Sequence, residues 1–354
     1  MKNWQQILQS SVTTTEQLSK FVQINTQQVE QVIQHYPMKI NPYFLKLAIK
    51  KGPSLLRQVL PDIRELYDDV CQADPLGEEK NSPVPNLIHR YRDRVLLMVS
   101  QECAIYCRFC TRKRRVGRNG FKITRESIEK GIDYIKRHRE VRDVLISGGD
   151  PLLLSDEQLD WILAAVRDIR HVEIVRIGSR VPGALPQRVT PHLAKVLRKY
   201  HPLYLNIHFN HPDEITKESS QACQLLADAG IPLGSQTVLL RGINDNAEVL
   251  AALMKKLLAI RVRPYYLFQA DPVKGISHLR TSIEVGIHLI EKLRANLSGM
   301  AVPDYVVDVP GNGGKIPLLP QYLVELNEKE AVLRSYQGEI YSYPQKPDLH
   351  PSAH

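Results

Sequence analysis

Residues 94–117 read RVLLMVSQECAIYCRFCTRKRRVG. An apolar run, RVLLMVS, is followed directly by three cysteines, Cys103, Cys107 and Cys110, and then by a basic run. A short apolar run of this kind is typical of a buried β-strand. The stretch therefore predicts a strand whose carboxyl end carries a group of thiols.

Short apolar runs of this kind recur toward the C-terminus. Five more apolar runs predict buried strands, at residues 142–150, 173–179, 203–209, 233–240 and 264–271. Between them lie amphipathic segments that predict helices, including residues 127–139, 156–169 and 246–260. Alternating strands and helices are typical of βαβ units and a parallel sheet. We predict an α/β fold, a partial (β/α)6 barrel of the TIM type, with an N-terminal helical cap.

Three segments are expected along the chain. Residues 1–75 contain helical-period stretches, such as 15–24 and 54–67, broken by prolines, and they predict a helical region. Residues 76–320 hold the barrel, and residues 321–354 form a C-terminal extension. The junction CQADPLGEEKNSPVPN, residues 71–86, has the composition of a polar linker.

Composition excludes several classes of protein. A hydrophobic fraction of 43% in 354 residues is that of a folded globular protein. No apolar run approaches the roughly 18 residues that span a bilayer, and the first residues lack the apolar core of a secretion signal, so we expect a cytoplasmic protein without a membrane partner. The net charge of +9 is spread along the chain without a nucleic-acid-binding motif, so the clustered arginines favour small anionic ligands over nucleic acid.

The cysteine spacing C-x3-C-x2-C favours an iron–sulfur site. Five cysteines, three of them clustered, do not form a disulfide framework. Iron–sulfur clusters normally have four thiolate ligands, so three leave one iron of a [4Fe–4S] cluster open for a small molecule. A zinc site would need a fourth ligand, and Cys71 and Cys223 stand in other segments. Zinc, or three incidental thiols, stays as the alternative.

A lysine follows several glycines near the other end of the barrel, in VVDVPGNGGK. Gly313 and Gly314 remove side chains beside Lys315, so that the backbone can pass close to a bulky group. Such a lysine can form a Schiff base with pyridoxal phosphate, although a solvated lysine in a loop is the alternative. The phosphate-binding Walker loop is excluded, because Pro310 precedes the glycines and Ile316 follows the lysine.

The cysteine spacing, with Phe109 before the last thiol, resembles the signature of the radical S-adenosylmethionine (SAM) superfamily. The whole set of motifs is similar to the lysine 2,3-aminomutase family between about Ser82 and Pro320: HRYRDRVL, CRFCTRKRRVG, SGGDPL, NIHFNHPDEIT, SQTVLLRGIND, PYYLFQAD, GISHLRT and VVDVPGNGGK. The resemblance implies a barrel of the radical SAM type and three cofactors, a [4Fe–4S] cluster, SAM and pyridoxal phosphate.

The resemblance also assigns roles to site residues. It implies that Cys103, Cys107 and Cys110 bind the cluster, that Ser147, Gly148, Gly149, Asp150, His208 and Gln236 bind SAM, that Lys315, Arg90, Tyr91 and Arg94 bind pyridoxal phosphate, that Arg112 binds the substrate carboxylate, and that Asp271 and Asp308 bind the ε-ammonium of lysine. Arg108 is expected in the same anionic neighbourhood as Arg112. For Lys113, Arg114 and Arg115 the alternative is a solvated face.

The implied activity is an isomerase reaction that converts L-lysine to β-lysine, with electrons from a donor such as flavodoxin or ferredoxin. An aminomutase of the elongation factor P pathway, which forms (R)-β-lysine, is the alternative within this family. A non-catalytic iron–sulfur protein is the alternative from another class. Asn246 stands where zinc-bearing members have a cysteine, so no structural zinc is expected, and assembly into a homo-oligomer is left open.

Overall fold

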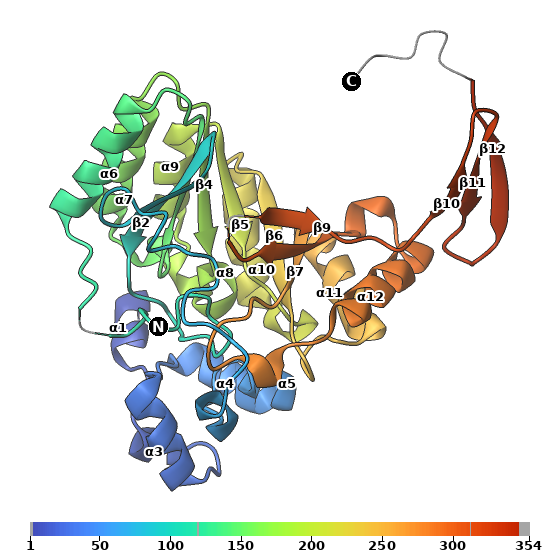
Figure 1. The fold of residues 1–354 in the computed structure, drawn as a ribbon. Helices are drawn as coiled ribbons and strands as arrows, with labels where there is room; N and C mark the ends of the chain where they lie inside the picture. The colour runs from blue at the N-terminus through green and yellow to red at the C-terminus, as the bar shows by residue number, and fades with distance from the viewer. Residues whose placement is uncertain (1–2, 119, 312, 347–354) are drawn as a thin grey trace.

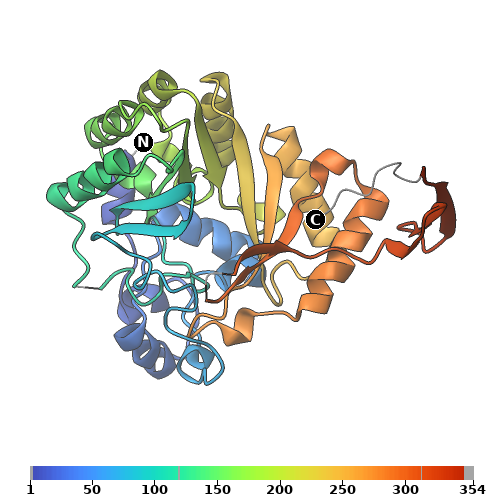
Figure 2. The ribbon, with the colours of Figure 1, turned by 45° about the horizontal axis from the view of Figure 1, so that its top comes forward.

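A nine-stranded sheet forms the centre of the protein, which a computed structural model describes over residues 3–118, 120–311 and 313–346. Its strands lie in chain order: β1 (Leu87–Tyr91), β2 (Arg94–Ser100), β3 (Asp143–Gly148), β4 (Ile174–Ser179), β5 (Leu203–Ile207), β6 (Leu233–Leu239), β7 (Arg263–Gln269), β8 (Asp304–Val309) and β9 (Gly314–Pro317). Strands β2 to β8 are parallel, and β1 and β9 are antiparallel edge strands. The sheet curls into a partial barrel (Figures 1 and 2), which confirms the predicted fold.

Helices connect the parallel strands and cover the outside of the barrel (Figure 2): α6 (Arg125–Arg137), α7 (Asp156–Arg167), α8 (Val181–Ala184), α9 (Pro191–Leu197), α10 (Lys217–Asp228), α11 (Ala247–Ala259) and α12 (Ile283–Asn296). In α6, the Thr124 side chain accepts the backbone N–H of Ser127 and begins the helix. Ile128, Ile132 and Ile135 then repeat at the spacing of one helix face and are buried. Short 3-10 turns complete the connections: η2 (Pro151–Leu153), η3 (Pro186–Arg188), η4 (Arg198–Tyr200), η5 (Pro212–Glu214), η6 (Ser277–Leu279) and η7 (Gly299–Ala301).

The strands are buried on the outer face of the barrel and partly open on the inner face. In β3, Val144 and Ile146 are fully buried, whereas Leu145 and Ser147 are only partly so and line a cavity. Successive side chains of a strand point to opposite faces, so this alternation means that the helices cover one face and a hollow interior lies on the other.

The N-terminal region consists of short helices: α1 (Trp4–Gln9), α2 (Thr15–Ser19), α3 (Thr26–His35), α4 (Pro42–Lys51), α5 (Pro53–Leu56) and η1 (Ile63–Leu66). The helical stretch expected at 15–24 ends at Ser19, and a separate helix, α3, begins after Asn25, whose side chain caps it. Ile40 forms a β-bridge with Ile105, and Asn41 Nδ2 donates to the Ala104 carbonyl (3.1 Å). The region thus supports the loop that carries the cysteines.

The predicted C-terminal extension, residues 321–354, contains a separate antiparallel sheet of β10 (Leu323–Leu326), β11 (Glu330–Arg334) and β12 (Ile340–Pro344). This sheet stands away from the barrel in both views (Figures 1 and 2). Residues 347–354 of the extension lie outside the described part. Among the helices that the structure describes, none has the length and apolarity to cross a membrane.

Candidate active site inside the barrel

A cavity of about 1110 Å³ occupies the interior of the barrel. All of the predicted site residues line it: Arg90, Tyr91, Arg94, Cys103, Cys107, Cys110, Arg112, Ser147, Gly148, Gly149, Asp150, His208, Gln236, Asp271, Asp308 and Lys315. These residues come from segments far apart in the sequence. The expectation that the reactive segments after the strands meet in one cavity is confirmed, as parallel strands place their carboxyl ends together.

The three cysteines lie on the loop that follows β2. Burial raises the pKa of Cys103, and it raises the pKa of Cys110 to about 11, with the neighbouring thiolates acting in the same direction. Within the described residues, no three His, Cys, Asp or Glu side chains are placed to hold a single metal ion. A cluster binds its thiolates through different irons, and three thiols without a fourth ligand fit a [4Fe–4S] cluster with one open iron.

The glycine turn at the end of β3 packs against the backbone at the start of the cysteine loop. Gly149 N donates to the Ser100 carbonyl (2.5 Å), and a Cβ on Gly148 would lie 2.2 Å from that oxygen. Gly148 also has φ +121°, which only glycine adopts readily. The Asp150 carboxylate accepts hydrogen bonds from neighbouring groups, the Ser179 hydroxyl (2.7 Å) and the Arg180 backbone N–H (2.7 Å). The glycines are therefore required by backbone packing, besides any contact with SAM.

Arg180, which was not among the predicted site residues, stands directly after β4 and lines the same cavity. Its Nη1 donates to Cys107 Sγ (2.7 Å), and its Nη2 pairs with the buried Glu214 (3.1 Å). Burial and the charge of Arg180 lower the pKa of His208 to about 3, so this imidazole is neutral, and its Nε2 lies 3.0 Å from Asn210 Oδ1. The position of Arg180 after a predicted strand was the signal that could have identified it.

The barrel is closed at its edges by side chains that we call the seam: Arg90 and Tyr91 of β1, Asp308 of β8 and Lys315 of β9. Arg90 Nη1 lies 2.6 Å from Asp308 Oδ1, and Lys315 Nζ lies 2.7 Å from Asp308 Oδ2. Asp308 and Lys315 are directly opposite in the antiparallel pair of β8 and β9. The alternative of a lysine free in a loop is not what the structure shows: Gly314 begins β9, and Lys315 lies on this strand, paired with Asp308.

Asp271 follows β7 and faces the seam. Burial raises the pKa of its carboxyl to about 7, and the charge of Asp308 contributes in the same direction. No side chain in the described ranges, 3–118, 120–311 and 313–346, forms a hydrogen bond or ion pair with this carboxylate. Asp271 is only partly buried and lines the cavity, so its carboxylate can be reached by an incoming ammonium, which would stabilise its ionised form.

Unpartnered polar atoms in the cavity fit pyridoxal phosphate. Tyr91 Oη, Arg90 Nε and Asn206 Nδ2 are buried and have no hydrogen-bond partner among the described groups. The guanidinium of Arg94 lies 4.3 Å from the centre of the Tyr91 ring. Buried donors are normally satisfied, and arginine forks match phosphate oxygens, so these residues would hold the phosphate beside Lys315.

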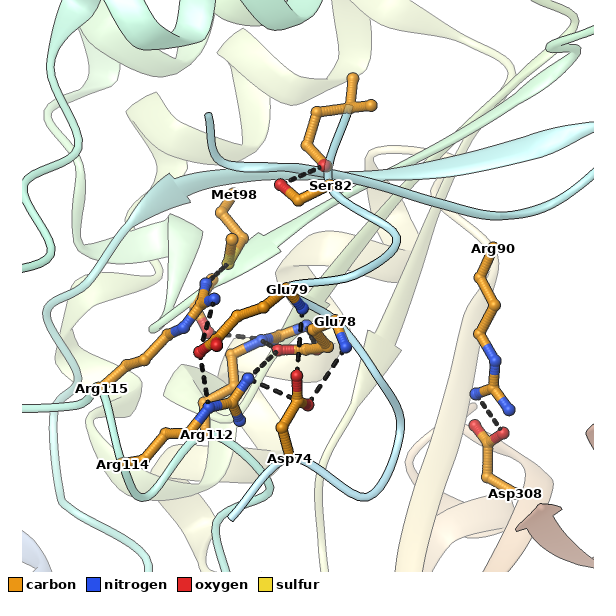
Figure 3. Close-up of polar contacts among 12 residues, drawn as sticks. Asp74, Glu78, Glu79, Ser82, Arg90, Met98, Arg112, Arg114, Arg115 and Asp308 are labelled. Carbon is orange, nitrogen blue, oxygen red and sulfur yellow. Dashed lines mark hydrogen bonds and ion pairs between the residues drawn. The ribbon is translucent and has the colours of Figure 1, made fainter. Parts of the chain in front are cut away.

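The arginines after the cysteines are bound by carboxylates (Figure 3). Arg112 lines the cavity, and its Nη2 lies 2.6 Å from Glu78 Oε1. Arg114 and Arg115 both pair with Glu79 (3.1 and 3.3 Å), and their side chains are only 15% and 14% exposed. The alternative of a solvated face is therefore wrong for them. Residues 71–86, expected as a linker, fold back to supply these acids.

Arg108 and Lys113 point away from the cavity. Both pair with the buried Glu65, at 2.7 Å for Lys113, and Arg108 also donates to the Pro37 carbonyl (3.0 Å). Burial lowers the pKa of Lys113 to about 8, although Glu65 opposes the shift. The expected place of Arg108 beside Arg112 is wrong, because the N-terminal helices supply an acid on the other side of the loop. Lys113 is likewise buried and not a solvated residue.

Comparison with known proteins agrees with this site. Residues 97–254 match the radical SAM superfamily, and residues 290–353 match lysine-2,3-aminomutase. L-lysine 2,3-aminomutase of Clostridium subterminale is 48% identical over 96% of this chain and 83% of its own length, and that of Methanococcus maripaludis is 48% identical over 98% and 81%. Glutamate 2,3-aminomutase of Clostridioides difficile is 43% identical over 97% and 82%. The chain therefore belongs to the lysine 2,3-aminomutase family, radical SAM isomerases that use a [4Fe–4S] cluster, SAM and pyridoxal phosphate.

Proposed function

We propose that this aminomutase acts on L-lysine and moves its amino group from C2 to C3, giving β-lysine. The observation that carries the proposal is the pair of carboxylates Asp271 and Asp308 in one cavity, with Lys315 Nζ 2.7 Å from Asp308 Oδ2. Two carboxylates in a desolvated site favour a second ammonium on the substrate and disfavour the second carboxylate of glutamate.

The substrate's two ends would be held by different parts of the cavity. Arg112 would bind the α-carboxylate, and Asp271 and Asp308 would bind the ε-ammonium. Lys315 donates to Asp308 in this structure; with Lys315 engaged by pyridoxal phosphate, that carboxylate would be open to the incoming ε-ammonium. When bound, pyridoxal phosphate withdraws electrons from the amino-bearing carbon, and SAM with the cluster supplies the radical that removes hydrogen. A small electron-transfer protein such as flavodoxin or ferredoxin would reduce the cluster.

Product analysis tests the proposal. The protein is reconstituted anaerobically with iron, sulfide, pyridoxal phosphate and SAM, reduced, and supplied with L-lysine or L-glutamate. We expect (S)-β-lysine from L-lysine and no β-glutamate, as resolved by chiral chromatography.

Other products would contradict the proposal in distinct ways. β-Glutamate would mean that the acids at the seam do not select lysine. (R)-β-lysine would place the protein in the elongation factor P pathway. A reducible cluster with no β-amino acid from either substrate would favour an electron-transfer role.

A further inference from the structure

Arg112 is fixed on two sides of its guanidinium. Its Nε and Nη2 donate to Glu78 Oε2 (3.1 Å) and Oε1 (2.6 Å), and its Nη1 donates to the Gly148 carbonyl (3.2 Å). In the described part of the chain, no other acceptor bonds this side chain. A guanidinium has five N–H groups, so two remain free, one on each Nη. Glu78 occupies one edge of the fork, and the end of the fork, with one N–H of each Nη, is the other edge that binds a carboxylate through two parallel bonds.

Glu78 is itself held in place by an acidic strap, which we define as residues 74–79 (Figure 3). The Asp74 carboxylate accepts the backbone N–H groups of Glu78 (3.1 Å) and Glu79 (3.0 Å). Arg114 Nη2 pairs with the other side of this turn, 3.0 Å from Asp74 Oδ1. The strap is therefore held by the Asp74 carboxylate and by Arg114, independently of the contact between Glu78 and Arg112.

The pair of Glu78 and Arg112 is buried, with side chains 9% and 12% exposed. Without Glu78, the guanidinium would be a buried charge with one partner fewer and free to rotate about a long side chain.

We propose that Glu78 is a positioning residue that fixes Arg112 with two N–H groups directed at the α-carboxylate of the substrate, and so makes the site select an amino acid over a diamine of the same length. The inference rests on the proposed function, in which Arg112 holds the carboxylate. Glu78 itself does not touch the substrate carboxylate, because like charges repel. The opposite role makes the opposite prediction: if Glu78 competed with the carboxylate for Arg112, its neutralisation would tighten lysine binding.

The test compares two ligands on the reconstituted holoenzyme by isothermal titration calorimetry. L-Lysine carries the carboxylate, and cadaverine has both amino groups of lysine but no carboxylate. The ratio of their dissociation constants therefore reports the carboxylate contact alone. Four proteins are compared: the natural protein, Glu78→Gln, Arg112→Gln and the matched control Glu79→Gln, whose carboxylate binds Arg114 and Arg115 but not Arg112.

We expect Glu78→Gln to weaken lysine binding about tenfold, the loss of one charge-assisted bond, and to leave cadaverine binding unchanged. Glu79→Gln should keep the natural ratio, and Arg112→Gln should remove the preference for lysine. If Glu78→Gln fails to retain the cluster, Glu78→Asp gives the same comparison, because it keeps the charge but shortens the reach; an intermediate ratio is then expected.

Two results would overturn the inference, and they are distinguishable. Lysine binding that is unchanged or tighter in Glu78→Gln or Glu78→Asp, with a large loss in Arg112→Gln, refutes the positioning role and leaves the proposed function intact. A natural ratio in Arg112→Gln refutes the assignment of Arg112 to the carboxylate, and the inference falls with it.

Discussion

The two ends of the cavity differ in how their buried charges are paired; Figure 3 shows Arg112 with Glu78 at one end and Arg90 with Asp308 at the other. At the cysteine end, the cations Arg112 and Arg180 pair with Glu78 and Glu214, respectively. At the seam, the carboxylate of Asp308 is shared by Arg90 and Lys315, and the neighbouring Asp271 pairs with no cation among the residues that the structure describes.

The difference separates fixed charges from exchangeable ones. Removing one member of a complete buried pair leaves an uncompensated charge, so the cysteine end resists change. Asp308 pairs with two cations, and Asp271 pairs with none among the described residues. These two carboxylates can therefore exchange ion-pair partners when a charged ligand binds. We infer that the cysteine end is organised before ligands bind and that the seam changes its ion pairs on binding.

Replacement of Lys315 with Ala should break the seam and have the largest effect. Activity should be lost, because no amine remains to bind pyridoxal phosphate covalently. Borohydride reduction followed by peptide mass spectrometry should find the pyridoxyl group on Lys315 in the natural protein and none in the variant, while iron and sulfide contents stay unchanged. Lys274→Ala, an exposed lysine after β7, is the control. A pyridoxyl group on another lysine of the variant would mean that the wrong lysine was chosen.

Glu65→Gln tests whether the cysteine loop is as fixed as the comparison implies. The substitution leaves Arg108 and Lys113 buried without their acid and should lower the free energy of unfolding by about 3–5 kcal/mol. Denaturation in urea, followed by tryptophan fluorescence under anaerobic conditions, measures the change. Glu173→Gln, which removes an exposed pair with Arg142, should have no measurable effect. Equal stability of the two variants would show that the loop does not depend on this network.

Asp308→Asn removes the shared charge of the seam. It should raise the activation free energy derived from kcat/KM for lysine by about 2–5 kcal/mol, as expected when one partner of a buried charge pair is lost. Asp304→Asn, an exposed residue at the start of the same strand, is the control. Steady-state rates equal to those of the control would remove Asp308 from the substrate site.

The sequence predicted the parts of the site that follow local rules. The cysteines, the SGGD turn, His208 and Asp271 each come directly after an apolar run, and parallel strands bring such positions together. Lys315 was identified from its glycines, but its place on a strand was not, because the β8–β9 hairpin depends on pairing across the turn.

The ion pairs that orient the site could not be predicted in this way. Glu78 lies 34 residues before Arg112, and Glu65 lies 43 residues before Arg108. No local pattern distinguishes these acids from those of a solvated linker, since their partners are set by how the N-terminal segments fold back on the barrel. Composition alone therefore misassigned residues 71–86.

The pH dependence of lysine binding tests whether Asp271 meets the substrate, and its expected effect is weaker than those of the substitutions above. The pKa of Asp271 is about 7, so its carboxyl is largely neutral below this pH and ionised above it. Because only the carboxylate attracts the ε-ammonium, lysine should bind about tenfold more tightly at about pH 8 than at about pH 6. Norleucine, which lacks the ε-ammonium, corrects for titration of the α-amino group and of the cofactor, so the lysine-to-norleucine ratio of dissociation constants is the quantity to measure. In Asp271→Asn this ratio should not vary with pH.

Binding of lysine below pH 7 should also release a proton, because by linkage a ligand that prefers the ionised carboxylate lowers its pKa. Calorimetry in buffers of different ionisation enthalpy detects this release. A pH-independent ratio in the natural protein, or the same slope in Asp271→Asn, would show that the unpaired acid does not meet the substrate and that exchange at the seam is confined to Asp308.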